Sequence, residues 1–252
     1  MTFPRQLLLN LDSCNEPSLN NFVVGKNAEL VAHLEKIFHV ILHAANNETH
    51  GNTFLSPAER FIYLWGESGC GRSHLLKAIQ YPNKNLCRAL DYQSSIKDFY
   101  YEKSVLLYII DDCEKLRKGQ QIAAFNLFNE MRNTKDACLV IAGNAAPNQL
   151  KLRPDLSTRL SWGLSYYVSS LSDEEKIAAI ELSAINRGLI LSPGVAPYLL
   201  NHFKRNMRTL MSLLDQLEIY SLEKQRSITI PLLRLMLMQN NETSSDAIDH
   251  LS

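Results

Sequence analysis

Short, unbroken apolar segments alternate with amphipathic segments along the first part of the chain. A strand buried on both faces of a parallel sheet reads as a continuous apolar run, whereas a helix repeats its apolar positions every three or four residues. The pattern therefore predicts an α/β domain, in which helices cover both faces of a parallel sheet. The predicted strands span residues 61–65, 86–92, 105–110 and 137–142, and the predicted helices span residues 26–45, 73–79 and 120–134.

From residue 172 onward the chain shows helical periodicity only. Ser172 and Glu175 have the spacing of a capping box, and Gly188 suits the left-handed residue that follows a helix. We expect Pro231 to begin the last helix, because proline is favoured in the first helical turn. Further helices are predicted over residues 193–204 and 207–224.

These patterns set the predicted domain boundaries. An N-terminal arm covers residues 1–20, and the α/β domain covers residues 21–168. A small all-helical domain covers residues 169–239, and the polar residues 240–252 are expected to form a flexible tail.

Composition and charge limit the classes of protein to which the chain could belong. Its 252 residues, with 46% hydrophobic content, are enough to bury a full core. Lysine plus arginine and aspartate plus glutamate both number 26, so no overall basic field favours nucleic acid, and we expect no sequence-specific DNA binding. No apolar run reaches the length of a membrane span, and the first residues lack the features of a signal peptide. We therefore expect a cytoplasmic protein with no membrane partner.

The cysteines add no metal site to this picture. They are odd in number and have no metal-ligand spacing, so we expect reduced and mostly buried thiols. They stand at Cys14, Cys70, Cys87, Cys113 and Cys138.

Residues 66–73, Gly-Glu-Ser-Gly-Cys-Gly-Arg-Ser, have the spacing of a phosphate-binding P-loop with arginine in place of the usual lysine. A predicted strand precedes them and a predicted helix follows, so backbone N–H groups and the helix dipole would point at phosphate oxygens. A plain glycine turn between strand and helix is the alternative, which the flanking segments disfavour. The predicted phosphate-binding residues are Gly66, Ser68, Gly69, Cys70, Gly71, Arg72, Ser73 and His74.

Arg72 changes the chemistry expected of this loop. A lysine ammonium is compact, whereas a guanidinium is a longer planar fork that binds oxygens in pairs. We therefore predict a site that holds a diphosphate well, as in ADP, or ATP, but stabilises γ-phosphoryl transfer badly. Whether the protein is itself an enzyme stays open, and we expect no robust ATPase activity.

Polar residues follow the predicted strands 105–110 and 137–142. Asp111 and the hydroxyl of Ser73 are expected to hold the water shell of Mg²⁺, and Asp112 could orient an attacking water. Asn144 could bind a γ-phosphate, although asparagine after glycine is also common in turns. The alternative is that these residues only mark strand ends.

Two arginines outside the P-loop stay ambiguous on local pattern alone. Arg159 lies just beyond the predicted α/β alternation and could pair with Asp155, four residues earlier on a helix. Arg208 is at the start of the helix 207–224, where it could simply extend along the apolar side.

The order of these motifs resembles the AAA+ family of the bacterial replication initiator DnaA, and most closely the Hda family of DnaA-related regulatory inactivators. The resemblance covers about residues 5–238 and implies a P-loop AAA+ sheet followed by a helical lid domain. The segments that carry it are 21–25, 66–73, 110–112, 142–144, 157–163, 171–176 and 207–210.

The resemblance implies roles for the matched residues of the nucleotide site. Val23 and Val24 would help line the adenine pocket, and Asp111 would be the acid on the magnesium side. Asn144 would occupy the sensor 1 position. Arg208 would be the sensor 2 residue, which reaches from the lid to the nucleotide.

Arg159 would be an arginine finger that acts in trans, inserted into the ATP site of DnaA. A guanidinium from a neighbouring subunit neutralises charge that develops on the γ-phosphate. The resemblance also implies that the N-terminal arm docks on the sliding clamp, the β subunit of DNA polymerase III. An extended peptide of this kind would lie in an apolar groove, although the arm could instead be an edge strand or a disordered start. The clamp-binding residues would be Gln6, Leu7, Leu9 and Leu11.

Two functions therefore stay open. The first is an ADP-bound regulatory adaptor that links DnaA to the clamp, stimulates hydrolysis of DnaA-bound ATP and so prevents re-initiation of replication. The second is an AAA+ ATPase that acts as a helicase loader or an initiator-like remodeller. An initiator would need a DNA-reading module after the lid, and a loader would turn over ATP. The resemblance leaves a homodimer open.

Overall fold

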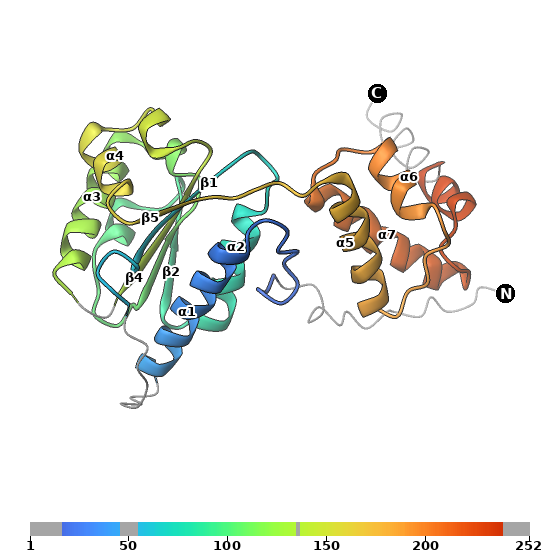
Figure 1. Cartoon of the computed structure of the whole chain (residues 1–252), viewed down its shortest axis with the longest axis horizontal. Helices are drawn as coiled ribbons and strands as arrows, with labels where there is room; N and C mark the ends of the chain where they lie inside the picture. The colour runs from blue at the N-terminus through green and yellow to red at the C-terminus, as the bar shows by residue number, and fades with distance from the viewer. Residues whose placement is uncertain (1–16, 46–54, 135–136, 239–252) are drawn as a thin grey trace, which may run out of the picture.

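The computed structural model describes residues 17–45, 55–134 and 137–238, which form an α/β domain followed by a helical domain (Figure 1). In the described part of the chain, five parallel strands form one sheet in the order β2-β3-β4-β1-β5. The strands are β1 (Phe61–Trp65), β2 (Cys87–Leu90), β3 (Leu107–Ile110), β4 (Cys138–Gly143) and β5 (Leu164–Tyr167). The predicted parallel sheet is confirmed.

Two helices cover each face of the sheet (Figure 1). On one side lie α1 (Ala28–Ala45) and α2 (Arg72–Gln80), and on the other lie α3 (Lys118–Arg132) and α4 (Pro154–Leu160). Short 3₁₀ helices lie in the connections between strands and helices. They are η2 (Tyr81–Asn83), η3 (Ile96–Phe99), η4 (Cys113–Lys115) and η5 (Pro147–Gln149).

Strand β1 shows why its sequence is apolar throughout. Phe61 and Tyr63 pack with α3 and α4, whereas Ile62 and Leu64 pack with α1 and α2. Successive residues therefore face opposite helical layers, and both layers exclude water.

Strand β5 was not predicted. Among the described strands it is an edge strand that pairs with β1 alone, and its residues alternate between half-buried and exposed. This strand and α4 continue the α/β alternation past Arg159, so the expectation that this residue lies just beyond that alternation is wrong.

The helical domain contains α5 (Asp173–Asn186), α6 (Val195–His202), α7 (Met207–Lys224) and a helix over residues 230–238. The predicted capping box and the glycine after α5 are confirmed: Gly188 has φ +71°, and its N–H donates to Ile185 O at 2.9 Å. The last helix begins at residue 230, so Pro231 is its second residue and not its first. Thr229 precedes it, with Oγ1 accepting from Leu232 N at 3.3 Å.

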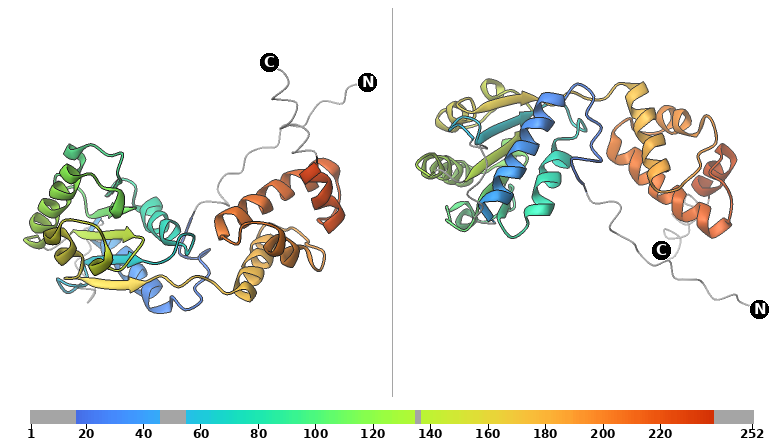
Figure 2. Two further views of the ribbon diagram at one scale, coloured as in Figure 1. Left: turned by 90° about the horizontal axis from the view of Figure 1, so that it is seen from above. Right: turned by 60° about the horizontal axis from the view of Figure 1, so that its bottom comes forward.

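The segment after β5 joins the two domains, and Figure 2 shows the helical domain at one end of the molecule from two further directions. In the described residues, no helix has the length and apolar character needed to cross a membrane.

Candidate nucleotide-binding site

The P-loop connects the end of β1 to the start of α2, as predicted. Gly71 has φ +106°, a left-handed conformation that strains any residue with a side chain. A Cβ atom at this position would also lie 2.8 Å from Phe22 Cε2. Ser68 and Gly69 are exposed, while Cys70 is buried and its pKa is raised by that burial. The loop therefore has the backbone form of a phosphate cradle, with an exposed rim.

The Arg72 side chain folds across this loop. Its Nη1 donates to the carbonyl oxygen of Gly66 and, at 3.4 Å, to that of Glu67. The guanidinium thus lies over the loop backbone, where a bound phosphate would compete with these carbonyls for its donors.

Ser73 and Asp111 line one cavity of about 210 Å³, between α2 and the ends of β2 and β3. Asp111 N donates to Leu90 O at 3.0 Å, which fixes the residue at the end of β3. One hydroxyl and one carboxylate fit the few protein ligands that Mg²⁺ takes when phosphates and waters supply the rest. Among the described residues, no group of three or more His, Cys, Asp or Glu side chains could hold a metal without such help.

Asp112, which was expected to orient a water, forms an ion pair within its own chain. Its backbone is left-handed, at φ +48°, and its carboxylate pairs with Lys115 Nζ at 2.6 Å, which raises the pKa of that lysine. Asn144 is exposed at the end of β4, and the following turn is held by Tyr63, whose hydroxyl donates to Ala145 O at 2.6 Å. Of these two strand-end residues, Asp112 is therefore held by Lys115, whereas the exposed side chain of Asn144 could reach a phosphate.

His74 contacts the segment before α1 and not the loop. Its Nε2 lies 3.1 Å from Ser18 O, and its ring centroid lies 5.6 Å from that of Phe22. Burial lowers the pKa of His74, which keeps the imidazole neutral at neutral pH. Val23 and Val24 are half-buried in the same segment. Phe22, which belongs to the matched segment 21–25 but was given no role, therefore brings this segment against the start of α2.

The helical domain meets the site through the starts of α5 and α7. A Cβ on Gly69 would lie 2.9 Å from Cβ of Asn206, the residue that caps α7. A Cβ on Gly25 would lie 3.1 Å from Glu175 Oε1. Arg208, in the first turn of α7, is exposed and has no polar partner within the described ranges. The structure thus places Arg208 on the helix that touches the P-loop.

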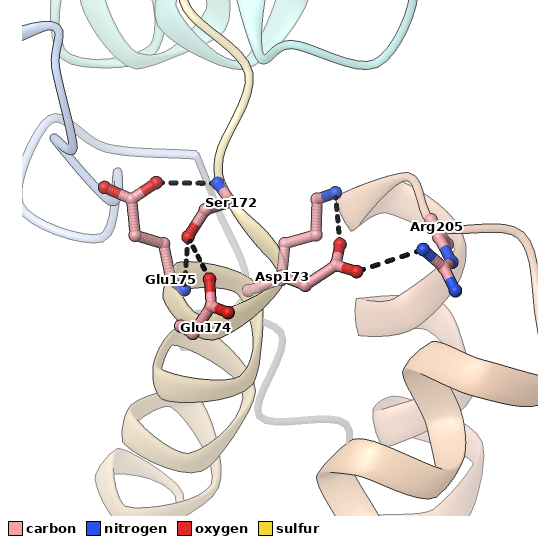
Figure 3. Close-up of polar contacts among 6 residues, drawn as sticks. Ser172, Asp173, Glu174, Glu175 and Arg205 are labelled. Carbon is pink, nitrogen blue, oxygen red and sulfur yellow. Dashed lines mark hydrogen bonds and ion pairs between the residues drawn. The ribbon is translucent and has the colours of Figure 1, made fainter.

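Figure 3 shows the polar contacts at the start of α5. Ser172 Oγ accepts from Glu175 N at 3.2 Å, and Glu175 Oε2 accepts from Ser172 N at 2.7 Å. Asp173 pairs with Arg205 at 3.0 Å and with Lys176 at 3.3 Å. Arg205 precedes Asn206, so this network fixes the loop that touches Gly69.

Arg159 lies on α4, on the sheet face opposite α2. Its guanidinium carbon is 5.5 Å from the ring centroid of Phe125 and 5.7 Å from that of Phe128. The alternative pairing of Arg159 with Asp155 is wrong. Asp155 sits in the first turn of α4, where Arg153 binds both of its oxygens, at 3.2 and 2.8 Å, and lowers its pKa.

Comparison with known proteins is consistent with this architecture. Residues 173–237 match the family model described as Hda, lid domain. Domain III of the replication initiation protein DnaA from Thermotoga maritima has a TM-score of 0.64 at 20% identity, covering 88% of this chain and 95% of that chain.

Longer proteins share the same fold. AMPPCP-bound DnaA from Aquifex aeolicus has a TM-score of 0.60 at 21% identity, covering 82% of this chain and 66% of that chain. The Holliday junction branch migration motor RuvB from Thermotoga maritima has a TM-score of 0.61 at 14% identity, covering 89% of this chain and 72% of that chain. At these identities the likeness shows the fold, while the helical domain carries the closer relationship. The chain thus joins a helical domain that matches the Hda lid model to an α/β domain that shares the fold of DnaA domain III.

Proposed function

We propose that this protein is a regulatory adaptor of replication initiation, which binds ADP in its P-loop site and stimulates hydrolysis of ATP bound to DnaA. The observation that carries the proposal is the place of Arg159. This side chain lies on the sheet face opposite its own P-loop helix and has no carboxylate partner in the part of the chain that the structure describes.

A guanidinium on that face is better placed to serve a site on another molecule than its own. Arginine presents five N–H donors, and contact with aromatic rings leaves them available to oxygen acceptors. In a neighbouring ATP site such donors neutralise charge on the γ-phosphate as it transfers, which is worth about three to five orders of magnitude in rate. Arg159 is accordingly the proposed trans-acting arginine finger.

The chain's own site is suited to holding a nucleotide. In this proposal, the loop from Gly66 to Ser73 binds the phosphates, and Arg208 reaches them from the lid. Ser73 and Asp111 would hold Mg²⁺, which supplies charge neutralisation to the phosphates when bound. Arg72 in place of lysine and the pairing of Asp112 with Lys115 both argue against fast hydrolysis.

The link to the sliding clamp stays a prediction from the sequence. Gln6, Leu7, Leu9 and Leu11 lie outside the described residues, so their docking role rests on the motif alone. Likewise, DnaA as partner rests on the relationship of the helical domain to Hda and on the shared fold.

A reconstituted assay tests the proposal. ATP-loaded DnaA, DNA-loaded clamp and this protein are mixed, and ATP hydrolysis is followed for wild type, Arg159→Ala and Arg153→Ala. We expect Arg159→Ala to lose the stimulation by about a thousandfold while clamp association persists. Arg153→Ala is the matched control, because Arg153 is held by Asp155 at the start of the same helix. Full activity of Arg159→Ala would refute the trans role.

The clamp link is tested in the same mixture with Gln6→Ala. We expect this variant to stimulate less because docking is weakened, and excess protein should restore the rate. An unchanged rate at limiting protein would remove the clamp from the proposal.

An ATP-driven loader or remodeller is the alternative, supported by the fold shared with the RuvB motor. It predicts fast ATP turnover by the purified protein alone. The adaptor predicts slow turnover, so a single hydrolysis measurement without DnaA separates the two functions.

A further inference from the structure

The cavity of about 210 Å³ that holds Ser73 and Asp111 extends past these two residues, along one face of α2. The ends of β2 and β3 and the turn after β2 form one wall. The other wall is a single stripe of α2, whose residues stand at helical spacing. They are Ser73, Leu76, Lys77 and Gln80.

Lys77 is the one positively charged residue among the described residues that line this cavity. It is exposed, and it forms no hydrogen bond or ion pair with the part of the chain that the structure describes. Arg72, by contrast, donates to the carbonyl oxygens of Gly66 and Glu67. The ammonium of Lys77 therefore keeps its N–H donors available to a ligand in the cavity.

Two carboxylates line the same cavity, and backbone groups already bind one oxygen of each. Asp91 Oδ1 accepts from Gln93 N at 2.8 Å and from Ser94 N at 3.0 Å, which holds Asp91 in the turn after β2. Asp111 Oδ1 accepts from Asp112 N at 2.9 Å. Neither acid pairs with Lys77 within the described ranges, so the ammonium is not neutralised by its own cavity.

The direction of a helical side chain brings this ammonium toward the side of the site where Ser73 and Asp111 would hold Mg²⁺. A Cα–Cβ bond in a helix tilts toward the N-terminus, so a side chain covers the turn before its own Cα. Ser73 lies one turn before Lys77, about 6 Å along the helix axis. The flexible four-carbon stem of lysine spans such a turn. Lys77 Nζ can therefore reach phosphate oxygens held beside Ser73.

We propose that Lys77 is a phosphate-binding residue that acts from the magnesium side of the nucleotide site and makes ADP binding largely independent of Mg²⁺. Lysine is a compact charge with three N–H donors, and it is a common phosphate ligand in P-loops. Here its ammonium neutralises the terminal phosphate of ADP. The same charge repels Mg²⁺ from the hydroxyl and carboxylate that would hold the ion. This inference rests on the proposed nucleotide site.

The test is calorimetric titration of the full-length protein with ADP, in excess Mg²⁺ and in EDTA. We expect the affinity of wild type to differ by less than about threefold between the two conditions. Lys77→Met keeps an unbranched side chain with good helix propensity but removes the charge. Its affinity in EDTA should fall about tenfold, as the loss of one charged hydrogen bond implies, and Mg²⁺ should restore most of that loss.

Two further variants are controls. Lys77→Arg keeps a positive charge with N–H donors, so it should bind ADP in EDTA within about threefold of wild type. Lys151→Met removes an exposed lysine between η5 and α4, on the other side of the sheet, and should change the affinity in neither condition. Thermal unfolding checks that each variant folds.

The outcomes separate the inference from the function beneath it. Wild type that binds ADP in Mg²⁺ but not in EDTA, or a Lys77→Met variant with wild-type affinity in EDTA, would overturn the role of Lys77 and leave the nucleotide site standing. Wild type that binds ADP in neither condition would overturn both. At saturating ADP, Mg²⁺ should also bind Lys77→Met more tightly than wild type, and equal Mg²⁺ affinities would contradict the proposed repulsion.

Discussion

Arg72 and Arg159, on opposite sides of the α/β domain, have different surroundings. On the α1–α2 side, Arg72 of the P-loop donates to carbonyl oxygens of its own loop, and Lys36 of α1 pairs with Glu59 at 2.7 Å. On the α3–α4 side, the guanidinium of Arg159 lies over two aromatic rings and binds no acid in the described ranges. A charged side chain that donates to acceptors of its own chain has fewer donors left for another molecule. A guanidinium that lies over aromatic rings keeps its N–H donors available to a partner protein. The difference supports a molecule that holds a ligand on one side and acts on another protein with the other.

The substitution with the largest expected effect is Gly71→Ala, in the P-loop, which tests whether this side of the domain binds a ligand. The positive φ and the short approach to Phe22 together cost about 3 kcal/mol, so we expect nucleotide affinity to fall about a hundredfold. Gly188→Ala is the control: this glycine also has a positive φ, +71°, but an added Cβ meets nothing within 4 Å. Calorimetric titration with ADP measures both variants. Equal affinities would mean that the loop does not hold the phosphates.

Arg72→Lys should make the ligand side behave more like an active ATPase. Lysine is a compact charge that follows the phosphates and does not bridge the loop carbonyls, so we expect intrinsic ATP hydrolysis to rise about tenfold. Arg117→Lys provides a matched change away from the loop, because the Arg117 guanidinium donates to Tyr92 O, at 2.9 Å. Release of inorganic phosphate reports the rate. No rise for Arg72→Lys would assign the slow turnover to another residue.

Glu59→Gln tests the contribution of the Lys36–Glu59 ion pair on the α1–α2 side. The hydrogen bond from Lys36 and those from Ser56 lower the pKa of Glu59 from 4.5 to about 2, so its ionised form stabilises the fold above pH 4.5. This contribution is lost as pH falls from 4.5 toward 2. Because both side chains are about a third exposed, at 37% and 29%, we expect a loss of only about 1 kcal/mol at pH 7.

Chemical denaturation at pH 7 and at pH 2 measures this difference. The gap between wild type and Glu59→Gln should nearly close at the lower pH. Glu102→Gln is the control, because Glu102 pairs with Arg88 at 2.7 Å but is 53% exposed. A gap that is the same at both pH values would contradict the ionic origin of the effect.

The smallest expected effect is that of Phe125→Leu, on the α3–α4 side of the sheet, where the ring contacts Arg159. Loss of one cation–π contact removes about 0.5–1 kcal/mol of positioning for Arg159, so stimulation of DnaA should fall about threefold. Phe125→Tyr keeps the ring and should keep the rate. If both variants were as active as wild type, the rings would not orient the guanidinium.

The central strands could be predicted because both faces of each are buried. The unbroken apolar runs of β1 and β4 are typical of strands that lie between two helical layers, and turn residues mark where each run ends. Strand β5, Leu-Ser-Tyr-Tyr, could not be found in this way, because an edge strand with exposed alternate residues carries no such run.

The P-loop was predictable from glycine spacing, whereas local pattern did not reveal its surroundings, which were expected only from the resemblance. Phe22 and Asn206 approach the loop from segments far away in sequence, and only the fold brings them there. Asn206 did carry a local signal, as an asparagine that precedes a helix, but nothing in that signal indicates what it touches. The mistaken pairing of Asp155 with Arg159 has the same origin, since helical spacing alone did not reveal the competing fork of Arg153.

The amide of Asn27, a residue that is 4% exposed, determines where the molecule can bend. Val168 N donates to Trp65 O at 2.7 Å and Ser169 is bonded on both sides by Asn27, so the chain is anchored to the sheet up to that residue. The Ser172 cap then begins a rigid helix, which leaves residues 170 and 171 as the pivot. We expect a rotation about it that opens the lid to move Asn206 away from Gly69 while Asn27 stays in place, so that the P-loop is uncovered before the sheet is disturbed.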